Sequence, residues 1–183
     1  KRHAWNFHKH GNKQNWAYRT FIKDVDLFRE EGLTEDATLS DSFRNAYKIY
    51  LQKLEEKRFL DFSSILRIAV DTLEKEPSVK KKLQDQYSFF TVDEYQDVNP
   101  IQEKLIQIIS NKQNVCVVGD DDQSIYQFRG ADVQNIITFQ KRYPKAAIHQ
   151  LDINRRSSDA IVKTADELIK LNNPGRLKKS IKD

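Results

Sequence analysis

The sequence predicts an α/β fold, in which a parallel sheet with flanking helices is preceded by a helical segment. Three compact apolar runs, at residues 87–92, 115–118 and 146–153, alternate with helical patterns at residues 100–109 and 133–142. Strand, helix, strand, helix, strand at this spacing is typical of βαβ units with parallel strands. A polar cluster follows each apolar run, and this is where such sheets place their working residues.

Helical patterns dominate the N-terminal third of the chain. Between residues 43 and 54, apolar side chains recur at three- and four-residue spacing, which places them on one helix face. Ser40 or Ser42 is a suitable N-cap for this helix.

Two more helices are expected before the first apolar run. One should begin within residues 61–64 and end before Pro77, and a shorter one should cover residues 79–86. Further along, Pro100 suits the first turn of a helix, where its missing N–H is no loss.

Positive charge is concentrated at the two ends of the sequence. Residues 1–23 hold six Lys/Arg, three His and no acid, with aromatic residues interleaved, and four Lys/Arg follow Gly175. Basic side chains attract phosphate and aromatic rings stack on unpaired bases, so contact with nucleic acid is one interpretation. The alternative for the N-terminal stretch is a solvated helix face whose aromatic residues pack into a core.

The composition of the chain indicates which cellular compartment to expect. No stretch approaches the ~20 apolar residues of a membrane span, and residues 1–10 lack the apolar core of a secretory signal. The single cysteine, Cys116, has no partner for an internal disulfide, which favours a reducing compartment and a cytoplasmic location. Because the chain begins with Lys1 and contains no Met, we expect it to be a piece of a longer protein.

Two acids, Asp93 and Glu94, follow the first apolar run. An acid at the end of a buried strand can hold Mg²⁺ through water, and a neighbouring acid can take a proton from an attacking water. Taken alone, the pair is equally compatible with an ordinary polar strand end.

Longer strings surround the three strand ends. They are residues 92–102 (VDEYQDVNPIQ), 117–131 (VVGDDDQSIYQFRGA) and 151–158 (LDINRRSS). These strings closely resemble motifs II, III and IV of UvrD/Rep-type superfamily 1 DNA helicases, in that order. The resemblance runs from about Phe59 to the end of the chain. Residues 1–58 are similar to the family only in position and helical character.

The resemblance implies an ATP site, with ATP and Mg²⁺ as cofactors. Asp93 is similar to the Mg²⁺-associated acid, Glu94 to the general base for water, and Gln123 to the residue that senses the γ-phosphate. Arg156 resembles the arginine finger of the second motor domain. Arg155 stands where the family usually has an aromatic residue that stacks on adenine. A guanidinium can also stack, so adenine contact is expected in altered form.

The resemblance also implies a site for DNA. Tyr126 and Phe128 lie where the family places aromatic residues that stack on single-stranded bases, and Arg129 resembles the arginine that couples motif III to Glu94. Without the resemblance, Tyr126 and Phe128 could be core residues, Arg129 part of a surface ion pair, and Gln123 the cap of a turn. The acids at 120–122 lack the alternating spacing of a calcium loop, and we interpret them as turn residues.

A phosphate-binding loop is missing from these residues. Such a loop needs Gly, four residues, Gly, then Lys and Ser/Thr. None of the five glycines is followed by Lys, and no two of them are five apart. The chain on its own is therefore expected to have little or no ATPase activity.

The domain organisation follows from the resemblance. Residues 1–58 are expected to close an inserted helical subdomain (1B-like). Residues 59–148 should form the second half of the first RecA-like motor domain (1A-like, of the P-loop NTPase type), and residues 149–183 should begin the second (2A-like).

The implied parent protein is an ATP-dependent 3′–5′ DNA helicase and translocase. Its expected partners are single-stranded and duplex DNA, and no membrane partner is expected. The rest of the parent chain would supply the Walker A loop and most of the second motor domain. Two alternatives are a helicase–nuclease subunit with the same motor and a catalytically inactive DNA-binding module. Intact residues at 93, 94, 123 and 156 argue against the inactive module.

Overall fold

A computed structural model shows an α/β chain that divides into two compact units. One unit comprises residues 1–90 and 99–115, and the other comprises residues 91–98 and 116–183. The structure describes residues 11–30, 40–111, 114–127, 130–172, 175–177 and 179. Within those residues, no helix is both long and apolar enough to cross a bilayer.

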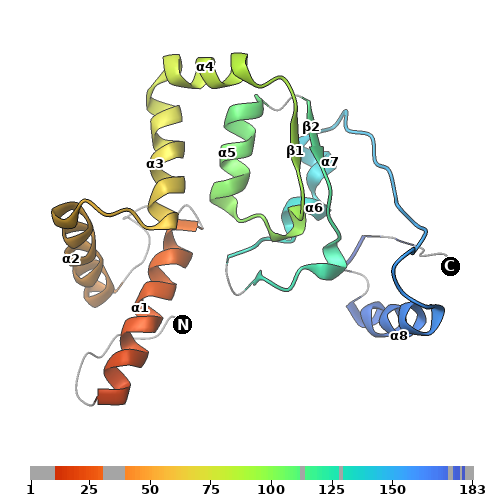
Figure 1. The fold of residues 1–183 in the computed structure, drawn as a ribbon, viewed down its shortest axis with the longest axis horizontal. Coiled ribbons are helices and arrows are strands. Elements are labelled where there is room, and N and C mark those ends of the chain that lie inside the picture. Colours follow the sequence, from red (N-terminus) through yellow and green to blue (C-terminus); the bar gives the residue numbers. More distant parts are fainter. Residues whose placement is uncertain are drawn as a thin grey trace. The chain divides into compact units, whose positions relative to one another are not determined.

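The first unit is helical. Its helices are α1 (Gly11–Glu30), α2 (Asp41–Lys57), α3 (Phe62–Lys75), α4 (Pro77–Gln86) and α5 (Pro100–Ser110). Figure 1 shows α3 and α5 side by side, and Val70 of α3 and Ile101 of α5 are both buried. The helices predicted over residues 43–54, 61–76, 79–86 and 100–109 are confirmed.

Local capping explains where these helices begin. Ser40 caps α2, because its hydroxyl accepts the backbone N–H of Phe43 at 3.3 Å. Asn99 and Gln102 form a reciprocal capping box at the start of α5, and Pro100 occupies the first turn as predicted. Short-range signals of this kind can be read directly from sequence.

Aromatic side chains form the core between α1 and α2. Phe21 and Phe28 of α1 pack with Phe43 and Tyr47 of α2, with ring centroids 5.4–6.0 Å apart. Phe21 therefore follows the core-packing interpretation of the N-terminal aromatic residues rather than the base-stacking one, whereas Tyr18 is exposed.

A buried ion pair joins α1 to the start of α3. The Nη1 atom of Arg29 lies 2.6 and 2.7 Å from the two carboxylate oxygens of Asp61, and its Nε donates to the Tyr47 hydroxyl at 3.0 Å. Asp61 also accepts the Tyr50 hydroxyl at 2.5 Å and caps α3 through the backbone N–H of Ser64. Burial raises the pKa of Asp61, but hydrogen bonds from Ser64 and Tyr50 and the charge of Arg29 outweigh it and lower the pKa to about 2.

Replacing Arg29 with Met should lower the free energy of unfolding by ~3–5 kcal/mol, because Asp61 would lose its counterion in a largely buried site. Arg19→Met, at an exposed position of the same helix, should change it little. Urea unfolding followed by circular dichroism measures both. The Asp61 contribution is complete above its unfolded pKa of ~4 and is lost as pH falls towards about 2, so the two variants should converge over that range. Equal midpoints at pH 7 would contradict a stabilising role for the pair.

The second unit contains a two-stranded parallel sheet. β1 (Phe90–Val92) pairs with β2 (Val115–Val117), and the backbone N–H of Val118 reaches the Val92 carbonyl at 2.8 Å. After the strands come two 3₁₀ turns, η1 (Tyr95–Asp97) and η2 (Asp121–Gln123). The remaining elements are α6 (Gln134–Ile137), α7 (Phe139–Arg142), α8 (Asp159–Ile169) and η4 (Lys170–Asn172).

Two sequence predictions for this unit were wrong. The strand predicted over residues 146–153 is absent: the segment has only an isolated bridge at Ile153, and Leu151 is 91% exposed. An apolar run forms a strand only where a neighbouring strand supplies hydrogen bonds and packing. The helix predicted over residues 133–142 is broken into α6 and α7 at Thr138, whose hydroxyl bonds the Gln134 carbonyl at 2.5 Å.

Candidate functional site

The candidate site lies where β1 and β2 end, at the same edge of the sheet. The backbone N–H of Tyr95 donates to the Val118 carbonyl at 2.9 Å, which brings the turn after β1 against the end of β2. Asp93 follows β1, and its carboxylate accepts the backbone N–H of Glu94 at 2.9 Å. Glu94 adopts a left-handed backbone conformation (φ 49°, ψ 42°), which redirects the chain into η1.

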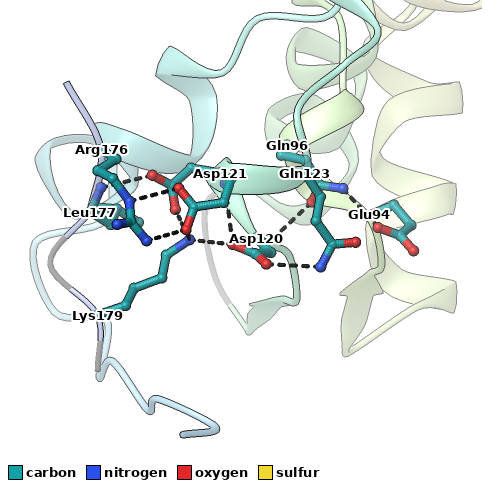
Figure 2. Close-up of polar contacts among 9 residues, drawn as sticks. Glu94, Gln96, Asp120, Asp121, Gln123, Arg176, Leu177 and Lys179 are labelled. Atoms are coloured by element: carbon teal, nitrogen blue, oxygen red, sulfur yellow. Dashed lines mark hydrogen bonds and ion pairs between the residues drawn. The ribbon is translucent and has the colours of Figure 1, made fainter. Parts of the chain in front are cut away.

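The Gln96 side chain links the turn after β1 to the turn after β2 by hydrogen bonds, as Figure 2 shows. Its side-chain amide donates to a Glu94 carboxylate oxygen at 2.7 Å, and its carbonyl oxygen accepts the backbone N–H of Asp120 at 3.0 Å. Gln96 is 1% exposed, whereas Glu94 is exposed, so the buried glutamine holds a carboxylate that faces solvent. Gln96 therefore sets the position of the Glu94 carboxylate relative to the second turn.

Gly119 makes this approach possible. A Cβ atom at this position would lie 2.6 Å from the Gln96 carbonyl oxygen and 3.1 Å from the Tyr95 backbone nitrogen. Real Cβ atoms essentially never come within 3.0 Å of such an atom, so a larger residue here would displace the Gln96 carbonyl oxygen from its place against the second turn.

Gln123 lies in η2, on the second turn. Asp120 caps η2 by accepting the backbone N–H of Asp122 at 3.2 Å, and it also accepts the Gln123 side-chain amide at 2.8 Å. The acids at 120–122 thus form a turn, as predicted. Gln123 stabilises that turn, in line with the capping interpretation, while its side chain stays exposed.

An open pocket of about 450 Å³ joins the two turns. Its lining consists of Glu94, Gln96, Asp97, Gln123, Ile125 and Tyr126. Three residues singled out from sequence are thereby brought together: Glu94, Gln123 and Tyr126. Asp93 is exposed beside Glu94 and does not line the pocket.

Asp97 contributes a second carboxylate to the lining of the pocket. Burial and the neighbouring charge of Glu94 raise the pKa of Asp97. One of its carboxylate oxygens is buried with no hydrogen-bond partner among the described residues. With Glu94 and Asp93 nearby, the site presents hard oxygen donors, the kind of ligand that Mg²⁺ prefers.

The remaining predicted residues lie elsewhere or cannot be placed. Arg155 and Arg156 are exposed and do not line the pocket. They precede α8 on a turn in which the Asn154 side chain accepts the backbone N–H of Arg156 at 2.9 Å. Phe128 and Arg129 lie outside the described residues, so their expected roles in base stacking and in coupling to Glu94 stay predictions.

Sequence reasoning did not single out Gln96 or Gly119 as functional residues. Both lie in turns, where no periodicity marks a side chain as buried. The available signal was Gln96 itself, a polar residue two positions after the pair of acids.

The sequence is similar to those of known helicases. A family profile described as "UvrD/REP helicase N-terminal domain" matches residues 5–144. The chain is 39% identical over 162 residues to the ATP-dependent DNA helicase PcrA of Staphylococcus epidermidis RP62A, covering 84% of the chain and 22% of that relative. It is 40% identical over 134 residues to PcrA of Staphylococcus aureus Mu50, covering 73% and 18%. The chain thus spans about a fifth of the length of these relatives.

Proposed function

Because this chain belongs to the UvrD/REP helicase family, we propose that it is part of an ATP-dependent DNA helicase that moves 3′ to 5′ on single-stranded DNA and unwinds duplex. The rest of the longer protein would supply the Walker A loop, which these residues lack, and most of the second motor domain. Residues 59–148 would then be part of the first RecA-like domain, residues 1–58 the end of an inserted helical subdomain, and residues 149–183 the start of the second motor domain.

The pocket at the carboxyl edge of the sheet is the observation that carries this proposal. Glu94 and Gln123 come from the turns after two parallel strands and line one open pocket. Open α/β sheets bind their ligands at this edge. A carboxylate and an amide on facing sides suit the two tasks of a phosphate-cleaving site, which are to accept a proton from water and to contact the phosphate that is lost.

The residues present fit Mg²⁺ and nucleotide. Asp93 would hold Mg²⁺, and Glu94 would accept the proton of the attacking water. When bound, Mg²⁺ neutralises phosphate charge. Gln123 would contact the γ-phosphate, and Arg155 and Arg156 would contact the adenine and the γ-phosphate.

The DNA site would lie next to the nucleotide site along the chain. Tyr126 lines the same pocket as Glu94 and Gln123, and it is 40% exposed. An exposed ring can stack on a base of any sequence, which suits a motor that steps along arbitrary DNA. Phe128 would extend this platform, and Arg129 would couple it to Glu94.

The full-length protein should hydrolyse ATP in a DNA-stimulated manner and unwind duplex with a 3′ single-stranded tail. Residues 1–183 alone should show little or no hydrolysis, because the backbone N–H cradle and lysine of a Walker A loop are missing. ATPase and strand-separation assays on both proteins, with a 5′-tailed duplex as the matched control, test this. DNA binding without ATPase activity in the full-length protein would instead support an inactive binding module.

A further inference from the structure

A basic segment lies against the acidic turn at residues 120–122. It consists of Arg176, Leu177 and Lys179 (Figure 2). The guanidinium of Arg176 donates to Asp122 at 2.8 Å, and the backbone N–H of Leu177 donates to Asp121 at 2.7 Å. These basic residues therefore contact carboxylates, although their charge alone suggested contact with nucleic acid.

The Lys179 ammonium contacts all three carboxylates, lying 3.0 Å from Asp122 and closer to Asp120 and Asp121. The three acids can place one oxygen each within 4.8 Å of the others, which is the spacing of a cation site. In this structure the cation is the chain's own ammonium group. The Lys179 side chain is 16% exposed, and its partners range from 1% for Asp121 to 36% for Asp120, so solvent screens the contact with Asp120 most.

Asp120 links Lys179 to Gln123 through its two carboxylate oxygens. One of its carboxylate oxygens binds Lys179, and the other accepts the Gln123 side-chain amide at 2.8 Å. Burial raises the pKa of Asp120, but hydrogen bonds from Lys179 and Gln123 outweigh it and lower the pKa. The carboxylate thus stays ionised between two donors, and the backbone N–H of Asp120 is held by Gln96 at 3.0 Å.

We propose that Lys179 is a positioning residue for Gln123, acting through the Asp120 carboxylate. The inference rests on the proposed role of Gln123 at the γ-phosphate. Lys179 anchors one oxygen of Asp120, and this orients the oxygen that holds the Gln123 amide. Without the ammonium, the three carboxylates repel one another, and only the 3.2 Å bond from the Asp122 backbone N–H still holds that oxygen of Asp120, so the side chain can turn away from Gln123 more easily. The segment after α8, more than 50 residues along the chain, thereby controls where the sensing amide points.

A double-mutant cycle in the full-length protein tests this proposal. Lys179→Met should lower the kcat of DNA-stimulated ATP hydrolysis by ~10- to 100-fold, the scale expected for a misplaced reacting group, with a smaller change in KM. Lys179→Arg should retain most activity. In a Gln123→Ala background, Lys179→Met should change kcat by less than ~2-fold, because the residue through which it acts is already gone.

Lys163→Met, at an exposed lysine of α8, is the matched control and should resemble the wild type. Melting temperatures of the same samples identify loss of fold. If Lys179→Met fails to fold, Lys179→Gln, which removes the charge and keeps a donor, replaces it in the cycle. Additive losses in the double mutant, or a normal kcat in Lys179→Met beside an impaired Gln123→Ala, overturn the positioning role alone. A normal kcat in Gln123→Ala overturns the sensor role and the inference together.

Discussion

Replacing Glu94 with Gln in the full-length protein should cut ATP turnover by at least ~100-fold, the usual scale for losing a general base. Binding of ATP should stay nearly intact, because the substitution removes a charge and a proton acceptor without changing side-chain volume. Steady-state ATPase kinetics and a binding titration on the same samples give the two quantities separately.

The surroundings of Glu94 make this substitution a clean test. Gln96 donates its amide to a Glu94 carboxylate oxygen at 2.7 Å, and the carbonyl oxygen of a glutamine at position 94 can accept the same bond. The left-handed backbone at position 94 is as accessible to glutamine as to glutamate, so the turn should keep its shape. A loss of turnover would then report chemistry and not a displaced side chain.

Asp93→Asn is the companion variant with a different expected signature. Asp93 is exposed and its carboxylate caps the backbone N–H of Glu94 at 2.9 Å, a bond that an asparagine oxygen can also accept. Its loss should raise the Mg²⁺ concentration needed for half-maximal turnover. If Glu94→Gln turns over ATP at a near-normal rate, Glu94 is not the base, and Asp93 or Asp97 becomes the stronger candidate.

Local signals explain how much of the fold could be predicted from sequence. Helix starts at Ser40 and Pro100 depend on groups within three or four residues, so the printed sequence contains the whole cause. The edge that gathers Glu94 and Gln123 could also be anticipated, since the polar residues after two parallel strands must meet.

Long-range partners explain what could not be predicted. The segment 146–153 has the composition of a strand, but pairing with a neighbour decides whether a strand forms. Gln96 meets Asp120 across 24 residues, and Lys179 meets the same aspartate across 59. Neither contact leaves a periodic pattern, because an amide or ammonium can be buried at any position where a partner of opposite polarity is brought to it.

Replacing Arg156 with Ala should lower ATP turnover of the full-length protein by ~10³-fold or more if the side chain acts as an arginine finger on the γ-phosphate. The position of Arg156 in the structure predicts that turnover falls without a loss of stability. Arg156 is exposed. An exposed arginine contributes little to stability, so the melting temperature should stay within about a degree or two of the wild type.

Two neighbouring variants separate the finger from a general charge effect. Arg156→Lys keeps a positive charge but loses the planar fork that matches phosphate oxygens, so it should remain strongly impaired. Arg155→Ala removes a positive charge one residue away and should mainly raise the KM for ATP, because Arg155 is expected against the adenine. Asn154 holds the backbone N–H of both Arg156 and Ser157 at 2.9 Å, so each variant should leave the turn in place. Equal effects of Arg155→Ala and Arg156→Ala on kcat would show that this turn supplies only net charge, and that the finger lies elsewhere.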